Sequence, residues 1–222
     1  SLRHLTIEET YELADAILEN DLHEIKNELG DVLLHLVFYA KIGSEKKAFD
    51  IGDVANAISE KLIARHPHIY GDTVVENEED VKQNWEKLKL KEGKNSVLEG
   101  VPKSLPALVK ASRIQDKVSG VGFDWEEPHQ VWDKVQEELS ELNEEIKKGT
   151  KDTIESEFGD VLFSMINYAR FINVNPENAL EKTNKKFMNR FQYLEKAAKK
   201  ERKELTEMSL SCLLYTSPSP RD

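Results

Sequence analysis

Residues 137–163 read EELSELNEEIKKGTKDTIESEFGDVLF, and residues 8–34 read EETYELADAILENDLHEIKNELGDVLL. The two stretches align without a gap at a constant offset of 129 residues, and each ends with Gly-Asp inside an apolar run. The match extends from Glu8–Lys41 onto Glu137–Arg170. A repeat of this length and spacing indicates an internal duplication, so we expect two copies of one structural unit.

Apolar residues recur at helical spacing along most of the chain, and no stretch shows the sustained alternation of a strand. Gly43 with Ser44 is expected to end the second helix, and residues 65–80, RHPHIYGDTVVENEED, read as a loop because Pro and Gly interrupt them. The pattern predicts an all-α fold with two tandem helical bundles, each built on an antiparallel helix hairpin. The predicted helices cover residues 6–20, 22–42, 51–64, 78–92, 105–118, 128–146, 153–173 and 176–203.

The repeat and the punctuation between its copies predict the domain limits. We expect an N-terminal domain over residues 1–92 that lacks its natural start, a linker over 93–104 and a C-terminal domain over 105–208. Residues 209–222 end in SCLLYTSPSPRD and abandon the charged helical pattern. We interpret them as a non-native tail, which also contains the single cysteine, Cys212.

The composition excludes several classes of protein. A formal net charge of −11 argues against a nucleic-acid-binding protein, which needs clustered Lys and Arg. No apolar run approaches the roughly 20 residues that span a bilayer, so no membrane partner is expected. The absence of a visible signal peptide and the lone cysteine favour a cytoplasmic protein.

Acidic residues in the repeat fall at the spacing that places them on one helix face. Glu138 and Glu141 project together, as do Glu157 and Asp160, because residues three or four apart are neighbours on a helix. A turn near Gly149 would bring the two pairs face to face, where a divalent cation would neutralise their repulsion. Oxygen-only donors suit Mg²⁺ or Mn²⁺, and Mg²⁺ in proteins usually shares its coordination with substrate phosphates.

A single acidic helix of this kind is usually a solvated surface, but three observations favour a metal site. The second acid pair of each copy lies on an apolar face, and the spacing is the same in both copies. Gly30 and Gly159 each cost about 1 kcal/mol within a helix, which predicts a close approach of backbone or ligand there.

Basic side chains near the acids could hold phosphates that the metal does not contact. Lys186 and Arg190 lie one turn apart on the last predicted helix, and Lys134 lies one turn before Glu138. Elsewhere, His35 is expected to be a hydrogen-bonded core residue, and Trp125 could line a base pocket.

These residues resemble the MazG family of all-α nucleoside triphosphate pyrophosphohydrolases. The acid pattern, Glu-Glu-x-x-Glu followed by Glu-x-x-Asp, is the MazG signature. The stretches RHPHIYGD, NWEKLK, VPKSLPALVKASRIQ, VGFDW and NKKFMNRF also look like the tandem-domain members. The likeness covers nearly the whole chain, from Thr6 to about Met208.

The resemblance implies hydrolysis of a nucleoside triphosphate to the monophosphate and pyrophosphate, with Mg²⁺ (or Mn²⁺) as cofactor, by a homodimer. Glu137 could then orient or deprotonate the attacking water. The implied metal ligands are Glu138, Glu141, Glu157 and Asp160, with triphosphate contacts from Lys134, Lys186 and Arg190. The equivalents in the first copy are the metal ligands Glu9, Glu12, Glu28 and Asp31 and the substrate contacts Lys61 and Arg65.

The sequence departs from the family pattern at three places. Leu5 stands opposite Lys134, which favours the C-terminal copy as the active one, as in a family member of this type. The family's upstream Cys-Pro-Trp-Asp element would lie before Ser1, and its Trp-bearing segment after Met208 is replaced by the tail. Two alternatives remain: a narrower pyrophosphohydrolase for dUTP, dCTP or phosphoribosyl-ATP, and a non-catalytic metal-binding helical interaction protein.

Overall fold

The computed structural model describes residues 2–71 and 96–201 of the chain. These residues form helices joined by turns and loops, with no strand among them, which confirms the predicted all-α class. The chain divides into two compact units, Ser1–Ser96 and Val97–Asp222. The helix predicted over 78–92 and the tail predicted over 209–222 lie outside the described residues.

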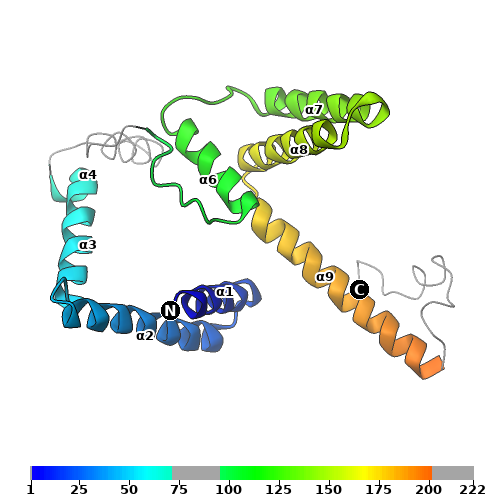
Figure 1. The fold of residues 1–222 in the computed structure, drawn as a ribbon. Coiled ribbons are helices and arrows are strands. Elements are labelled where there is room, and N and C mark those ends of the chain that lie inside the picture. Colours follow the sequence, from blue (N-terminus) through cyan, green and yellow to red (C-terminus); the bar gives the residue numbers. More distant parts are fainter. Residues whose placement is uncertain (1, 72–95, 202–222) are drawn as a thin grey trace. The chain divides into compact units, whose positions relative to one another are not determined.

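The first unit is built on a helix hairpin in which α1 and α2 lie side by side (Figure 1). Asn20 ends α1 in the left-handed conformation, with φ of 56°. The Asp21 side chain then accepts hydrogen bonds from the backbone N–H groups of His23 and Glu24, which caps α2. The helices of this unit are α1 (Arg3–Glu19), α2 (Leu22–Glu45), α3 (Ile51–Arg65) and α4 (Pro67–Tyr70).

Two sequence predictions in this unit are wrong. Gly43 does not end α2, which continues to Glu45. A Cβ atom at Gly43 would lie 2.7 Å from the Phe49 ring, so the glycine accommodates that ring rather than a helix end. Within the segment predicted as a loop, Pro67–Tyr70 forms the short helix α4, because proline is well suited to the first turn of a helix.

The second unit repeats the hairpin with α7 and α8, which also lie side by side (Figure 1). Gln130 Oε1 accepts hydrogen bonds from the backbone of Glu126 and Glu127 at the start of α7. Gly149 and Thr150 make the turn, where a Cβ on Gly149 would lie 2.8 Å from the Glu145 carbonyl oxygen. The helices of this unit are α6 (Ala107–Ser119), α7 (Pro128–Lys148), α8 (Lys151–Phe171) and α9 (Pro176–Glu201).

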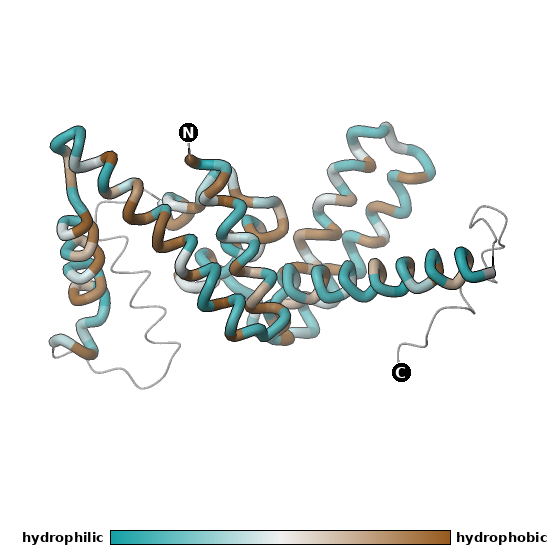
Figure 2. Tube along the Cα trace, turned by 90° about the horizontal axis from the view of Figure 1, so that it is seen from below, coloured by the Kyte–Doolittle hydropathy of each residue, from teal (hydrophilic) through white to brown (hydrophobic). Residues whose placement is uncertain are grey.

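Apolar side chains of α7 and α8 form the core of the second hairpin. Val131 and Val135 are fully buried on α7, and Val161 and Ile166 are buried on α8. Large apolar side chains elsewhere remain exposed, and hydrophobic positions recur along the helices of both units (Figure 2). In the second unit, α6, α8 and α9 enclose an apolar groove of about 800 Å³.

A polar network attaches the loop before α7 to α8. The Arg170 guanidinium donates hydrogen bonds to both carboxylate oxygens of Asp124, to Ser119 Oγ and to Asn167 Oδ1. Burial alone would raise the pKa of Asp124. The hydrogen bonds from Arg170 and Ser119 lower this pKa by more than burial raises it, so the net shift is downward. The ionised Asp124 therefore fixes the α6–α7 loop against the end of α8.

Within residues 2–71 and 96–201, no helix is both long enough and apolar enough to cross a membrane.

Candidate metal and triphosphate site

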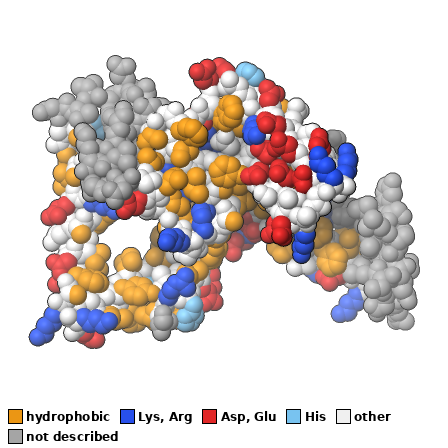
Figure 3. Space-filling view, turned by 45° about the horizontal axis from the view of Figure 1, so that its top comes forward, with side chains coloured by type: hydrophobic (Ala, Val, Ile, Leu, Met, Phe, Trp, Pro, Cys, Tyr) orange, Lys and Arg blue, Asp and Glu red, His pale blue; other side chains and the backbone are white. Residues whose placement is uncertain are grey.

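The second hairpin brings three of the predicted acids together. Glu138 and Glu141 on α7 and Glu157 on α8 each offer a carboxylate oxygen within 4.8 Å of the others, and we call this group the C-terminal acid cluster. Glu138 is 8% exposed, whereas Glu141 is exposed and Glu157 half-buried. Figure 3 shows acidic side chains gathered over this hairpin.

Neighbouring negative charges act on Glu157. Burial, followed by the charges of Glu141, Asp160 and Glu138, raises the pKa of Glu157. Asp160, the fourth predicted ligand, is exposed on α8 and contributes this charge without joining the three clustered oxygens. A cation bound at the cluster would neutralise this repulsion on Glu157.

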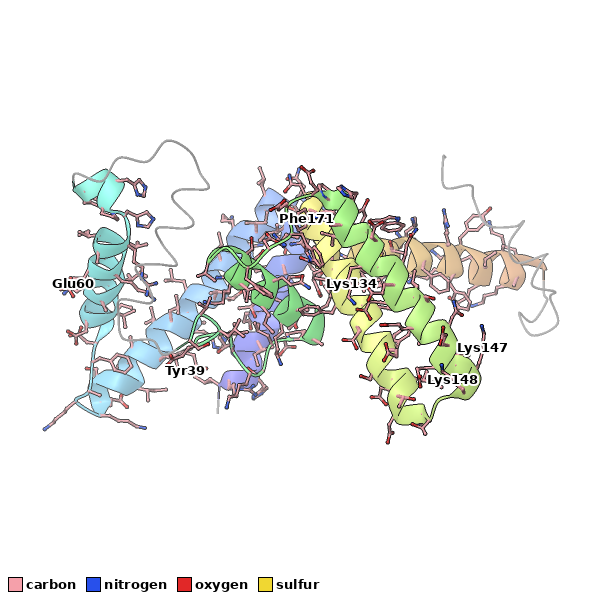
Figure 4. The ribbon with its side chains drawn as sticks, turned by 90° about the horizontal axis from the view of Figure 1, so that it is seen from above. Tyr39, Glu60, Lys134, Lys147, Lys148 and Phe171 are labelled. Carbon is pink, nitrogen blue, oxygen red and sulfur yellow. The ribbon has the colours of Figure 1, made fainter. Side chains whose placement is uncertain are left out.

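Lys134 is the predicted cation that reaches this cluster directly. Lys134 lies on α7 (Figure 4). Its Nζ atom lies 2.8 Å from Glu138 Oε1 and 3.1 Å from Glu137 Oε1, one helical turn further along that helix. The hydrogen bonds to Glu138 and then Glu137 raise the pKa of Lys134 well above its usual range. Lys134 is thus a permanent positive charge beside the cluster.

The first hairpin gathers a corresponding set of carboxylates. Glu9 on α1 and Glu28 and Asp31 on α2 bring oxygens within 4.8 Å of one another, and we call this group the N-terminal acid cluster. Glu12, the fourth predicted ligand, is exposed. Burial is the largest cause that raises the pKa of Glu28, and the charge of Glu12 is the next.

One carboxylate oxygen of the N-terminal acid cluster indicates that a metal fits there. Glu28 Oε2 is buried and has no hydrogen-bond partner among the described residues. A buried carboxylate oxygen left unpaired is costly, and a divalent cation would compensate it. Both clusters offer oxygen donors alone, which suits a hard cation such as Mg²⁺ or Mn²⁺.

A buried histidine distinguishes the first hairpin from the second. His35 is 7% exposed, its Nδ1 lies 3.1 Å from Thr6 Oγ1, and its Nε2 lies 3.8 Å from Glu9 Oε1. Thr6 Oγ1 also lies 2.8 Å from the Tyr39 hydroxyl. The predicted core histidine with a hydrogen-bond partner is therefore confirmed. At the equivalent place in the second hairpin, Ser164 donates to the Val161 carbonyl.

The remaining predicted cations lie on other helices. Lys186 and Arg190 are on α9, and Lys61 and Arg65 are on α3. Their roles toward phosphates remain predictions. Among the described residues, no other segment makes the predicted close approach at Gly30 or Gly159, because a Cβ at either glycine would meet nothing within 4 Å beyond its own helix backbone and chain neighbours.

Sequence reasoning missed two groups in the second unit. The Asp124–Arg170 pair joins residues 46 positions apart, a separation that no local pattern connects. The rings of Trp132 and Tyr168 lie 4.9 Å apart between α7 and α8. The repeat places Tyr39 opposite Tyr168, and this identity could have pointed to the Trp132–Tyr168 ring pair. Packing alone does not require a tyrosine at both positions.

Comparison with known proteins gives the family. The model for the "MazG nucleotide pyrophosphohydrolase domain" matches residues 1–70 and 126–194, which contain both acid clusters. The chain belongs to the MazG family. A nucleoside triphosphate pyrophosphohydrolase of Escherichia coli K12 is 41% identical over 214 residues, which cover 94% of this chain and 81% of that protein.

A second relative supports the same assignment. The nucleoside triphosphate pyrophosphohydrolase/pyrophosphatase MazG of Thermotoga maritima is 44% identical over 216 residues, covering 96% of this chain and 82% of that protein. These relatives confirm the predicted family and enzyme class. The family match also accounts for two acid clusters in one chain, since its two matched segments each contain one.

Proposed function

We propose that this chain hydrolyses nucleoside triphosphates to nucleoside monophosphate and pyrophosphate with Mg²⁺, mainly through its C-terminal copy. The observation that carries the proposal is the C-terminal acid cluster with the Lys134 ammonium beside it. The cluster supplies oxygen donors for a cation, and Lys134 supplies a donor for phosphate oxygens. Water is consumed, and the anhydride link between the α and β phosphates is broken.

Each residue has a role in this reaction. Glu138, Glu141 and Glu157 would hold Mg²⁺, and Asp160 would complete the set from the next turn of α8. When bound, Mg²⁺ neutralises phosphate charge and makes an attacking water more acidic. The Glu137 carboxylate, exposed on the same helix face as Lys134, orients that water and accepts its proton.

Positive side chains would bind the triphosphate. Lys134 exchanges its contacts with Glu137 and Glu138 for phosphate oxygens, and Lys186 and Arg190 bind the remaining phosphates from α9. Phosphoryl transfer needs mainly positioning and charge stabilisation, which these groups provide. In the first copy, Leu5 replaces the lysine, and for this reason we assign the activity to the second copy.

We propose that each chain has domains over residues 1–92 and 105–208, and that its working form is a homodimer. The exposed apolar side chains of the helices support it, since Leu29 and Leu33 on α2 and Phe158 and Leu162 on α8 are about half exposed. A second copy would cover these faces. Light scattering coupled to size-exclusion chromatography tests this, and a monomer at micromolar concentration would contradict it.

Product analysis tests the reaction. Purified chain with Mg²⁺ and each nucleoside triphosphate should yield monophosphate and pyrophosphate. Glu138→Gln should abolish the activity and the matched control Glu9→Gln should retain it, because only the first lies beside Lys134. The reverse result would assign the activity to the first copy, and release of orthophosphate alone would refute a pyrophosphohydrolase.

A further inference from the structure

The two acid clusters differ at one equivalent position on the first helix of each hairpin. In the second unit this position is Lys134 (Figure 4), and its ammonium contacts Glu138 and Glu137. In the first unit it is Leu5, which is 36% exposed and carries no charge. The sequence offset that aligns Glu9 with Glu138 also aligns Leu5 with Lys134.

The contact with Glu138 involves the innermost carboxylate of the C-terminal acid cluster. Glu138 is 8% exposed, and its Oε1 atom is the nearer of the two acceptors of the lysine. A divalent cation at the cluster would have to share this carboxylate with an ammonium group. Like charges a few ångströms apart repel, and a partly buried site screens that repulsion less than water does.

A polyphosphate changes this competition. Its oxygens give the ammonium other anionic partners, so that Glu138 becomes fully available to the cation. Lysine suits such an exchange because its ammonium is a point charge on a flexible stem rather than a fixed fork. Lys134 is 36% exposed and therefore has room to move.

We propose that Lys134 is a positioning residue that keeps the affinity of the C-terminal acid cluster for divalent cations low until a polyphosphate binds to its ammonium. This role rests on the proposed function, because it assumes that the cluster holds a cation and that the substrate carries phosphates. The site would thus load cation and nucleotide together. The N-terminal acid cluster, with Leu5 at this position, lacks this control.

Manganese binding to the full chain tests the proposal, with the free Mn²⁺ signal followed by electron paramagnetic resonance. Glu9→Gln with Glu28→Gln removes the N-terminal acid cluster as a background. On this background Lys134→Met should bind Mn²⁺ about tenfold or more tightly than the lysine form. Lys134→Arg, which keeps the charge, should leave the affinity unchanged. Equal or weaker binding by Lys134→Met would overturn the proposal.

Two further measurements separate this role from a structural one. Affinity for α,β-methylene-ATP at saturating Mn²⁺ should fall in Lys134→Met while affinity for Mn²⁺ alone rises, whereas structural damage would lower both and refute the role. In a chain carrying Glu138→Gln and Glu157→Gln, Leu5→Lys should weaken Mn²⁺ binding at the N-terminal acid cluster about tenfold. An unchanged affinity there would also refute it.

The proposed function and this role fail in different ways. If the unchanged chain hydrolyses nucleoside triphosphates and Lys134→Met leaves the affinity for Mn²⁺ unaltered, only the role of Lys134 would be overturned. Absence of hydrolysis with tighter Mn²⁺ binding in Lys134→Met would overturn the proposed reaction and support the role. If the chain bound no Mn²⁺ at either cluster, both would be wrong.

Discussion

Replacing Asp124 by Asn should lower the stability of the second unit. Asp124 accepts both Nη donors of Arg170, the Ser119 hydroxyl and the backbone N–H of Trp125. Asn has nearly the same shape but only one acceptor oxygen and no charge. Arg170 would keep Asn167 as a partner and would lose the ion pair that attaches the loop before α7 to α8.

The structure sets the size of this effect. Both side chains of the pair are 23% exposed. Because water screens their charges, the ion pair contributes less free energy of stabilisation than a fully buried charged hydrogen bond. We therefore expect a loss of about 1–2 kcal/mol in the free energy of unfolding. For a unit of this size, that loss lowers the thermal midpoint by roughly 3–10 °C.

Thermal unfolding of the full chain, followed by circular dichroism, measures the change. Glu144→Gln is the control, because its ion pair with Lys148 is exposed and should not alter the midpoint measurably. A double-mutant cycle with Arg170→Met should give a smaller combined loss than the sum of the two. Additive losses, or an unchanged midpoint in Asp124→Asn, would refute the contribution that we assign to the pair.

The pKa of Asp124 gives the same prediction a pH dependence. Because the folded-state pKa is lowered, the stabilisation is present above the ordinary carboxyl pKa and is lost as pH falls through the folded value. The difference between Asp124→Asn and the unchanged chain should therefore be full at neutral pH and disappear in strong acid. A constant difference would mean that the carboxylate charge is not the cause.

Three further predictions concern the clusters and a helix contact. Mg²⁺ at 100 times its dissociation constant should stabilise the folded chain by about 2.7 kcal/mol for each cluster that it fills, and Glu138→Gln should reduce the rise in the thermal midpoint. Because the pKa of Glu157 is raised in the folded chain, its contribution to stability is present below the unfolded pKa and is lost as pH rises through the folded value. Glu157→Gln should therefore raise the thermal midpoint of the metal-free chain at pH 7. A lower midpoint would contradict the charge repulsion. Overlap of a new Cβ at residue 43 with the Phe49 ring costs about 1–3 kcal/mol, and alanine regains about 1 kcal/mol of helix propensity. Gly43→Ala should therefore destabilise the first unit by at most about 2 kcal/mol in urea unfolding, and a stabilised variant would show that the ring moves freely.

Most of the fold follows from local patterns in the sequence. Helical spacing of apolar residues gave the long helices, and the Gly149 turn predicted the second hairpin. The wrong end of α2 had a tertiary cause, because Phe49 lies beyond the helix and no local signal places its ring against Gly43. A helix as short as α4 has too few residues for an apolar period to show.

The candidate site follows from sequence only to the level of helix faces. Spacing places Glu138 with Glu141 and Glu157 with Asp160, but it does not decide which oxygens converge. The clustered oxygens come from Glu138, Glu141 and Glu157 in one copy and from Glu9, Glu28 and Asp31 in the other. That choice depends on side-chain rotamers and on the angle between the two helices, which residue type and spacing leave open.

Both hairpins change direction within two residues, at 20–21 in one and 149–150 in the other. So short a link makes the turn sensitive to length. A single residue inserted into α8 ahead of Glu157 would rotate every later side chain by about 100° around the helix axis and carry its carboxylate away from Glu138. Deletions would do the same in the opposite sense. Natural variation in chain length among relatives should consequently accumulate between the hairpins, where an added residue moves whole units and leaves the geometry inside each one intact.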